Sequence, residues 1–389
     1  MIPTLDFKTK TIRTERPNGS VPGMWSVALD IGYSAVKGFS PTMVYSFPAY
    51  ARRISQSALL GTPRDDEIIY TDNTTGETWR VGATASDMIA SDEARDSNAA
   101  LYGRNRYFSP MFLAIARTGL GLGMMGNRYG LPEGKTLVVQ TGLPPAYLKS
   151  DTPLIKEVLS MEHDFSIKVG QRPVQNFKFI LPEKNIDVMP QPMGTLLSIA
   201  TNQSGVQIPE ATKYFSSNML IFDPGFGTLD VFNIKNRLVD SHETFDDLGM
   251  KRVFQDTTNE IFRQFGTEIT VPAMQKHLST GKISVYNRKE RRTAEKDFTD
   301  ILLNANEQVC YEALGRIDNI FNNLFDHQYL VITGGTGMAW DKIIRDYYKG
   351  MSGLTIVSGA QNDNLPCIFS NVRGYYMYLL GKLRRSSLR

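Results

Sequence analysis

Two stretches of the chain, one in each half, show the same alternation of apolar runs and glycine turns. Val27–Phe39 has an apolar run on each side of a turn that contains Gly32. Leu220–Ile234 repeats this arrangement, with Gly225 and Gly227 in its turn. Two apolar runs joined by a short glycine-bearing turn are typical of a β-hairpin. The sequence therefore predicts two hairpins.

The rest of the pattern alternates between strands and helices, which favours the α/β class. A third apolar strand runs from Tyr329 to Thr333 and enters the glycine-rich stretch Gly334–Gly337. Further strands are predicted at 136–142 and 186–189, and helices at 190–200, 298–325 and from Asn371 onward.

Each hairpin carries an aspartate at the end of its first strand, directly before the turn. These residues are Asp30 and Asp223, about half of the 389-residue chain apart. Glycine lets the backbone approach a ligand closely, and turn amides can hold phosphate oxygens. A carboxylate at such a place can face Mg²⁺ through water. The repeat predicts a duplicated fold that closes on a nucleotide from both sides. Asp230, after the second turn, suits a metal-side role or a role in its own turn equally well.

A strand that feeds a glycine turn at a helix start, as at Gly334–Gly337, is a nucleotide contact. With these three motifs in this order, the sequence resembles the actin-like ATPases, in the superfamily of actin, sugar kinases and heat-shock chaperones. Within it, the chain resembles the bacterial plasmid-segregation actins of the ParM type. FPAYARR (Phe47–Arg53), TWRVGATA (Thr78–Ala85) and NVRGYYMYLLG (Asn371–Gly381) resemble segments of those proteins, and the likeness covers roughly Trp25–Gly381.

The resemblance implies an actin-like fold of two related domains, each built on a mixed β-sheet with helices, with the nucleotide in the cleft between them. We expect a flexible lead-in at 1–24 and domain I at 25–190 together with 371–389. A crossover helix is expected at 191–206 and domain II at 207–370.

The resemblance also implies ATP or ADP with Mg²⁺ as the ligands, with GTP as an alternative nucleotide. Asp30 and Asp223 would hold hydrated Mg²⁺ and polarise the attacking water. Lys37 would reach the β- and γ-phosphates, although a surface lysine on an edge strand is the other interpretation. Phosphate contacts are expected from Gly32, Tyr33, Ser34, Gly225, Phe226, Gly227 and Thr228. Adenosine contacts are expected from Gly334, Gly335 and Thr336, with Lys251, Arg252 and Gln255 as weaker candidates.

Gln191, between Pro190 and Pro192, is the most diagnostic polar residue. Proteins of the ParM type often carry a glutamate here that activates the attacking water, whereas actin carries a glutamine. Glutamine is no useful general base, but it can orient water by hydrogen bonding. This departure predicts slow hydrolysis. A glutamine facing solvent at a helix start is the alternative.

The function that the resemblance implies is a filament-forming ATPase. It would assemble head to tail with ATP and Mg²⁺, disassemble after hydrolysis, and drive plasmid DNA segregation through a DNA-bound adaptor protein of the ParR type. The alternatives are a sugar-type kinase and a bacterial actin with a cell-shape, phage or chromosome role. A chaperone ATPase is disfavoured, because chaperones of this fold carry a further β-rich domain and only eight residues follow Gly381.

Composition adds little to this interpretation. The net charge is +3, so the surface as a whole does not attract polyanions. Two basic runs, 287–296 and 382–389, read more readily as a solvated helix face and a frayed terminus than as DNA contacts. No apolar run approaches the ~20 residues that span a bilayer. We therefore expect a cytoplasmic protein without membrane or direct nucleic-acid contacts.

Overall fold

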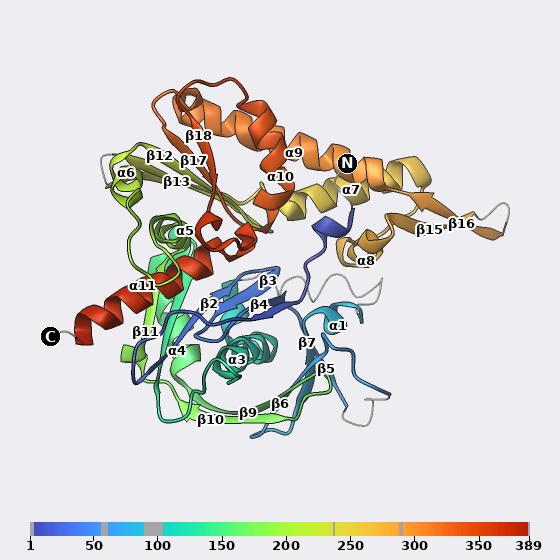
Figure 1. The fold of residues 1–389 in the computed structure, drawn as a ribbon. Coiled ribbons are helices and arrows are strands. Elements are labelled where there is room, and N and C mark those ends of the chain that lie inside the picture. Colours follow the sequence, from blue (N-terminus) through green and yellow to red (C-terminus); the bar gives the residue numbers. More distant parts are fainter. Residues whose placement is uncertain (1–3, 56–60, 89–103, 236–237, 288–290, 388–389) are drawn as a thin grey trace. The chain divides into compact units, whose positions relative to one another are not determined.

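The structure, a computed structural model, describes residues 4–55, 61–88, 104–235, 238–287 and 291–387 (Figure 1). The described chain forms two compact units. The hairpin-1 unit contains residues 9–88, 104–212 and 359–387 within the described ranges. The hairpin-2 unit contains residues 4–8 and 213–358. Each unit holds one of the two predicted hairpins.

The hairpin-1 unit contains two sheets and the helices that cover them. The six-stranded sheet has the order β1 (Ile12–Glu15), β4 (Met43–Pro48), β3 (Ala35–Phe39), β2 (Met24–Ile31), β8 (Thr136–Leu143) and β11 (Ile186–Pro190). The five-stranded sheet has the order β10 (Gln175–Ile180), β9 (Glu162–Val169), β6 (Ile68–Asp72), β7 (Thr78–Val81) and β5 (Ala51–Ile54). The helices are α1 (Ala83–Ser86), α3 (Pro110–Met124), α4 (Leu148–Ser160), α5 (Gln191–Ala200) and α11 (Ser370–Ser387).

The hairpin-2 unit is built on one five-stranded sheet and a two-stranded ribbon. The sheet has the order β14 (Leu238–Phe245), β13 (Leu229–Lys235), β12 (Met219–Pro224), β17 (Tyr329–Ile332) and β18 (Thr355–Ser358). The ribbon pairs β15 (Lys282–Asn287) with β16 (Arg292–Asp297). The helices of this half of the chain are α6 (Ala211–Ser216), α7 (Met250–Phe265), α8 (Val271–Lys276), α9 (Thr299–Ile320) and α10 (Gly335–Tyr347).

The two units repeat one sheet topology. In the first, β4, β3 and β2 are antiparallel, and β8 and β11 continue the sheet in parallel. In the second, β14, β13 and β12 are antiparallel, followed by parallel β17 and β18. Parallel neighbours need crossover helices, which is why helices separate these strands in the sequence. The predicted α/β class is confirmed.

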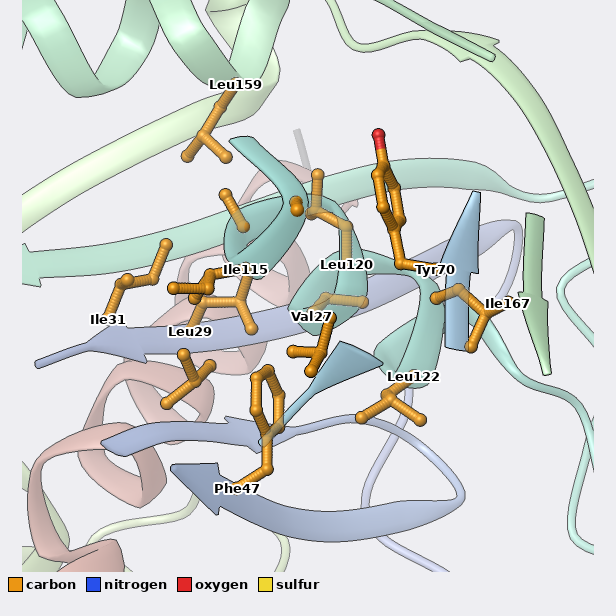
Figure 2. Packing of buried hydrophobic residues seen from close by; sticks show 14 of the residues in the cluster. Val27, Leu29, Ile31, Phe47, Tyr70, Ile115, Leu120, Leu122, Leu159 and Ile167 are labelled. Atoms are coloured by element: carbon orange, nitrogen blue, oxygen red, sulfur yellow. The ribbon is translucent and has the colours of Figure 1, made fainter. Parts of the chain in front are cut away.

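The central strand β2 shows how the hairpin-1 unit builds its core. Val27 and Leu29 pack with Ile115 and Leu120 of α3 (Figure 2). Ala28 belongs to a separate cluster with α11. Successive residues of a strand point to opposite faces, so β2 is buried on both sides and reads as a continuous apolar run.

Helices α5 and α11 cross at two glycines. A Cβ atom on Gly374 would lie 1.6 Å from the carbonyl oxygen of Gly194, and one on Gly194 would lie 2.5 Å from the ring of Tyr375. These distances leave no room for side chains at either glycine. The two backbones therefore pack in direct contact, and α11 lies beside α5 (Figure 1).

A buried arginine caps the C-terminal end of α5. Arg373, fully buried on α11, donates to the carbonyl oxygens of Ser198 (2.6 Å) and Thr201 (3.0 Å). Its charge is balanced by Asp363 at 2.8 Å, which also pairs with Arg16 at 2.7 Å. A cation at this end of a helix satisfies carbonyls that have no intrahelical partner.

Three expectations differ from the structure. Residues 1–24 are not merely a lead-in: a 3₁₀ turn spans Thr4–Phe7, and β1 pairs with β4 as an edge strand. The polar pattern of β1 hid a strand that is only half-buried. The basic run 287–296 lies in the β15–β16 ribbon rather than on a helix, with residues 288–290 outside the described part. The run 382–389 continues α11 as far as Ser387.

None of the helices in the described ranges combines the length and the hydropathy that a membrane-spanning helix needs.

The crossing of α5 and α11 predicts the effect of adding one methyl group. Gly374→Ala should lower the free energy of unfolding by at least about 2 kcal/mol, because a backbone carbonyl cannot move aside as a side chain can. Gly315→Ala in α9 is the matched control, since nothing lies within 4 Å of its new Cβ. It should stabilise by about 1 kcal/mol through helix propensity. Thermal unfolding followed by circular dichroism measures both, and equal stability of the two variants would contradict the packing described here.

Candidate functional site

The first hairpin brings a carboxylate and an ammonium group together on one face of its sheet. Asp30 ends β2 and pairs across the ladder with Lys37 of β3. Directly opposed residues share a face, and this one is the face that α11 covers through Ala28 and Phe39. Asp30 is only 2% exposed, and its Oδ2 lies 3.1 Å from Lys37 Nζ. The Lys37 side chain is therefore mostly buried and forms an ion pair with Asp30, so it is not a solvated surface lysine.

Gln191 completes this cluster. It is the first residue of α5, directly after β11 and Pro190. Its Nε2 donates to Asp30 Oδ1 at 3.0 Å, so both oxygens of Asp30 are engaged, one by Lys37 and one by Gln191. The side-chain nitrogen of Gln191 faces Asp30, and its side-chain oxygen, Oε1, remains as an acceptor. Among the predicted site residues, the structure thus joins Asp30 and Lys37 of one hairpin with Gln191, which is distant from both in the sequence.

Three carbonyl groups at the turn of the first hairpin accept hydrogen bonds within the protein. The Gly32 amide closes the turn on the Ala35 carbonyl at 3.0 Å. The Ser34 carbonyl accepts from the Ala49 amide at 2.9 Å, and the Ile31 carbonyl accepts from Arg106 Nη2 at 3.0 Å. A loop that offers its amides to an anion needs its carbonyls held in this way. Sequence reasoning missed both roles, because Ala49 lies in the segment FPAYARR without being singled out there and Arg106 belongs to no motif.

The second hairpin is held by different donors. The Gly225 amide closes its turn on the Thr228 carbonyl at 2.7 Å. The Gly225 carbonyl accepts from the Thr336 hydroxyl at 2.7 Å and from the Met250 amide at 3.2 Å. Thr336 therefore braces the hairpin, in addition to its predicted place beside the adenosine. Gly227 lies at the half-buried tip of this turn.

The N-terminus of α7 packs directly on this turn. The Lys251 amide donates to the Phe226 carbonyl at 2.8 Å. The Gly249 position must stay without a side chain, because a Cβ there would lie 2.8 Å from the same carbonyl. Of the weaker candidates, Arg252 pairs with Asp256 at 2.8 Å and Gln255 is exposed on α7.

The glycine loop after β17 meets the end of β12. Gly334 has φ +76°, and a Cβ there would lie 2.7 Å from Asp223 Oδ1 and 2.6 Å from the Pro224 carbonyl. Glycine is required both by this conformation and by this contact. Asp223 is 6% exposed, and Gly335, which begins α10, is exposed. The structure thus brings Asp223 and the predicted adenosine loop together within the hairpin-2 unit.

Asp230 braces the second hairpin. Its Oδ2 accepts from the Thr228 hydroxyl at 3.1 Å and its Oδ1 from the Thr244 hydroxyl at 2.6 Å. These bonds favour the role in the turn over a metal-side role. Burial raises the pKa of this carboxyl to about 6, while the two hydroxyl hydrogen bonds oppose the shift; Asp246 adds to it and His242 opposes it.

The raised pKa of Asp230 predicts a pH-dependent penalty on stability. The folded state holds the proton more tightly than the unfolded chain, so stability falls as pH rises from about 4 to about 6 and then stays lower. The penalty is on the order of 3 kcal/mol. Asp230→Asn should flatten this part of the pH profile and leave the protein at least as stable at pH 8, because the amide still bonds both hydroxyls.

Asp297→Asn is the contrasting control for that measurement. The Thr299 amide holds the pKa of Asp297 below its usual range, so this carboxylate stabilises the fold above its unfolded pKa and its loss should destabilise at neutral pH. Chemical unfolding from pH 4 to 8 measures both variants. A wild-type slope in Asp230→Asn would show that Asp230 is not the titrating group.

Comparison with known proteins agrees with this architecture. Residues 28–194 match the family model described as Actin like proteins N terminal domain. No curated protein matches the chain by sequence.

Solved structures match nearly the whole chain. A 15-stranded ParM filament from Clostridium botulinum is 20% identical, with 92% of this chain and 99% of that chain covered at a TM-score of 0.70. A non-polymerisable quadruple mutant of pCBH ParM is 19% identical, with 92% and 99% covered and a TM-score of 0.69. The archaeal actin homologue Ta0583 in complex with ADP is 15% identical, with 93% and 100% covered and a TM-score of 0.60. The fold of this chain is therefore actin-like, as its sequence predicted.

Proposed function

We propose that this protein binds and hydrolyses ATP and assembles into filaments in its ATP state. The observation that carries the proposal is the cluster of Asp30, Lys37 and Gln191 beside a glycine turn. The fold supports it, because a similar archaeal structure is a complex with ADP and a similar ParM structure is a filament.

The turns of the two hairpins and the glycine loop are the segments that we assign to the nucleotide. We assign the phosphates to the turn amides of Tyr33 and Ser34 and of Phe226–Thr228, because the Gly32 and Gly225 amides already close their own turns. Lys37 contributes a point charge beside the first turn. Gly334 and Gly335 lie at the start of α10, and the adenosine is assigned to this loop.

The carboxylates fit a magnesium ion that is held through water. No cluster of three or more potential ligands occurs among the described residues. Asp30 and Asp223 each lie at the end of a strand, one in each unit. Mg²⁺ keeps several waters and takes few protein ligands, so single carboxylates suit it. When bound, the ion would neutralise charge on the phosphates.

Gln191 would orient the attacking water. Its amide nitrogen is committed to Asp30, so its carbonyl oxygen is the group left to accept a water proton in a hydrogen bond. Glutamine does not remove that proton, so positioning is its whole contribution. We therefore expect hydrolysis to be slow.

The cellular role that we propose is plasmid DNA segregation. The filament would be a head-to-tail assembly of this chain, which stays open when its rotation does not close a ring. It would assemble with ATP and Mg²⁺, disassemble after hydrolysis, and reach DNA through an adaptor protein of the ParR type. The likeness to ParM structures supports this role.

Assembly gives the first test. Purified protein with ATP and Mg²⁺ should pellet on sedimentation and show filaments by negative-stain microscopy, and phosphate release should follow assembly. ADP or no nucleotide should give less polymer, and Asp223→Ala should slow phosphate release. ATP binding by a protein that stays monomeric at every concentration would overturn the filament proposal and call for a screen of sugar substrates.

Gln191 gives the second test. Gln191→Ala should slow phosphate release about 100-fold, the size of effect that removing one positioning group has at other sites. Assembly with ATP should persist, because the phosphate contacts remain. Gln264→Ala is the control, since this exposed residue of α7 bonds only to Glu260 among the described side chains. Wild-type release by Gln191→Ala would remove Gln191 from the mechanism.

A further inference from the structure

The turns of the two hairpins are equivalent position by position. A Cβ on Gly32 would lie 3.1 Å from the Ala35 carbonyl, and one on Gly225 would lie 3.2 Å from the Thr228 carbonyl. In both turns the glycine amide donates to that same carbonyl. The residue after the glycine is aromatic in each turn, Tyr33 in the first and Phe226 in the second.

The two aromatic residues have different anchors. Phe226 packs on Phe254 of α7, with ring centroids 6.2 Å apart. The guanidinium of Arg106 instead lies over the ring of Tyr33, with its central carbon 4.3 Å from the ring centroid. Arg106 also donates to the Ile31 carbonyl, at the other end of the turn. One arginine thus contacts both sides of Gly32.

The other groups that lie around the Arg106 guanidinium in the described part of the chain are aromatic rings. Its guanidinium also faces the rings of Tyr107 at 5.5 Å and Phe112 at 5.4 Å. Among the described residues, no carboxylate forms an ion pair with it. The cavity beside it, lined by Tyr33, Ala49 and Phe112 among others, holds about 10 Å³, which is room for about one water and no ligand.

The backbone of Arg106 is fixed as well. The residue lies in a 3₁₀ turn, Arg104–Phe108, and its carbonyl accepts from the Ser109 hydroxyl at 2.8 Å. Ser109 caps α3 by accepting from the Phe112 amide at 3.1 Å. The backbone of Arg106 is therefore anchored to the N-terminus of α3.

We infer that Arg106 is a positioning residue for the first phosphate turn. It holds the Ile31–Gly32 peptide by the carbonyl while the amide of the same peptide closes the turn, and it clamps Tyr33 by a cation–π contact. The second hairpin is held differently: amides of α7 bind the Gly225 and Phe226 carbonyls, and the ring of Phe254 packs on Phe226. Within the part of the chain that the structure describes, no ion pair balances the charge of Arg106, which lies beside a turn for an anion. The inference rests on the proposed nucleotide site.

The test compares Arg106→Met with a matched surface variant. Arg128→Met removes an exposed guanidinium that lies 4.8 Å over the ring of Tyr129, a residue outside the hairpin. Binding of a fluorescent ATP analogue with Mg²⁺ gives the dissociation constant. Arg106→Met should raise it about tenfold, the loss of one charge-assisted hydrogen bond of ordinary strength. Arg128→Met should match the wild type, and Arg106→Lys should recover only part of the loss because an ammonium lacks the planar stacking face.

Hydrogen exchange without nucleotide separates this inference from the proposed function. Arg106→Met should exchange faster in peptides covering 28–39 and unchanged in peptides covering 222–232, which contain the equivalent turn. Tyr33→Ala should give the same pattern if Arg106→Met does not fold. Equal exchange and equal affinity in the wild type and Arg106→Met overturn the inference. A wild type that binds no nucleotide, with faster exchange in Arg106→Met, overturns the proposed function and leaves Arg106 as the clamp of the turn.

Discussion

The direct contact between α5 and α11 is the constraint on which the candidate site depends. Because Gly194 and Gly374 bring the two backbones together, α5 cannot shift along α11 without a clash. Arg373 holds the C-terminal end of α5, and the hydrogen bond from Gln191 to Asp30 lies at its N-terminal end. Helix α5 is thus held along its length and at both ends, so the position of Gln191 at its start is fixed. The precision of the site thus depends on backbone packing about one turn along α5.

The hairpins show how one turn geometry is adapted to two chemical environments. In the first, the position across from the strand-end aspartate is Lys37, which forms an ion pair with Asp30. In the second, the equivalent position is Asp230. Burial disfavours its charged form, and its oxygens accept hydrogen bonds from two threonine hydroxyls. The first hairpin therefore carries a fixed cation, whereas the second relies on its amides and hydroxyl groups.

The sequence predicted the hairpins because their information is local. Alternating apolar residues and a glycine turn specify strand, turn and strand within about a dozen residues. The contact of Gln191 with Asp30 joins distant parts of the chain, and only the resemblance to a family had placed the two residues in one site. Arg106 carried no signal at all, because its partners Ile31 and Tyr33 are fixed by the packing of α3 on β2. The ribbon strand β16 was missed for another reason: its residues are mostly exposed and polar, so it lacks the apolar alternation of a half-buried strand.

The bonding of Asp30 decides how this carboxylate can work. An ionised carboxylate has about four lone-pair positions, and Lys37 and Gln191 use one on each oxygen. One position on each oxygen therefore remains for water, so Asp30 can accept from solvent without releasing either partner. A side chain that keeps its protein contacts while it binds water need not rearrange when charge develops nearby, so the free-energy cost of reorganisation is small. Asp30 is thus better suited to hold ordered water than to exchange ligands, and Gln191, bonded to the same carboxylate, is held to the same geometry.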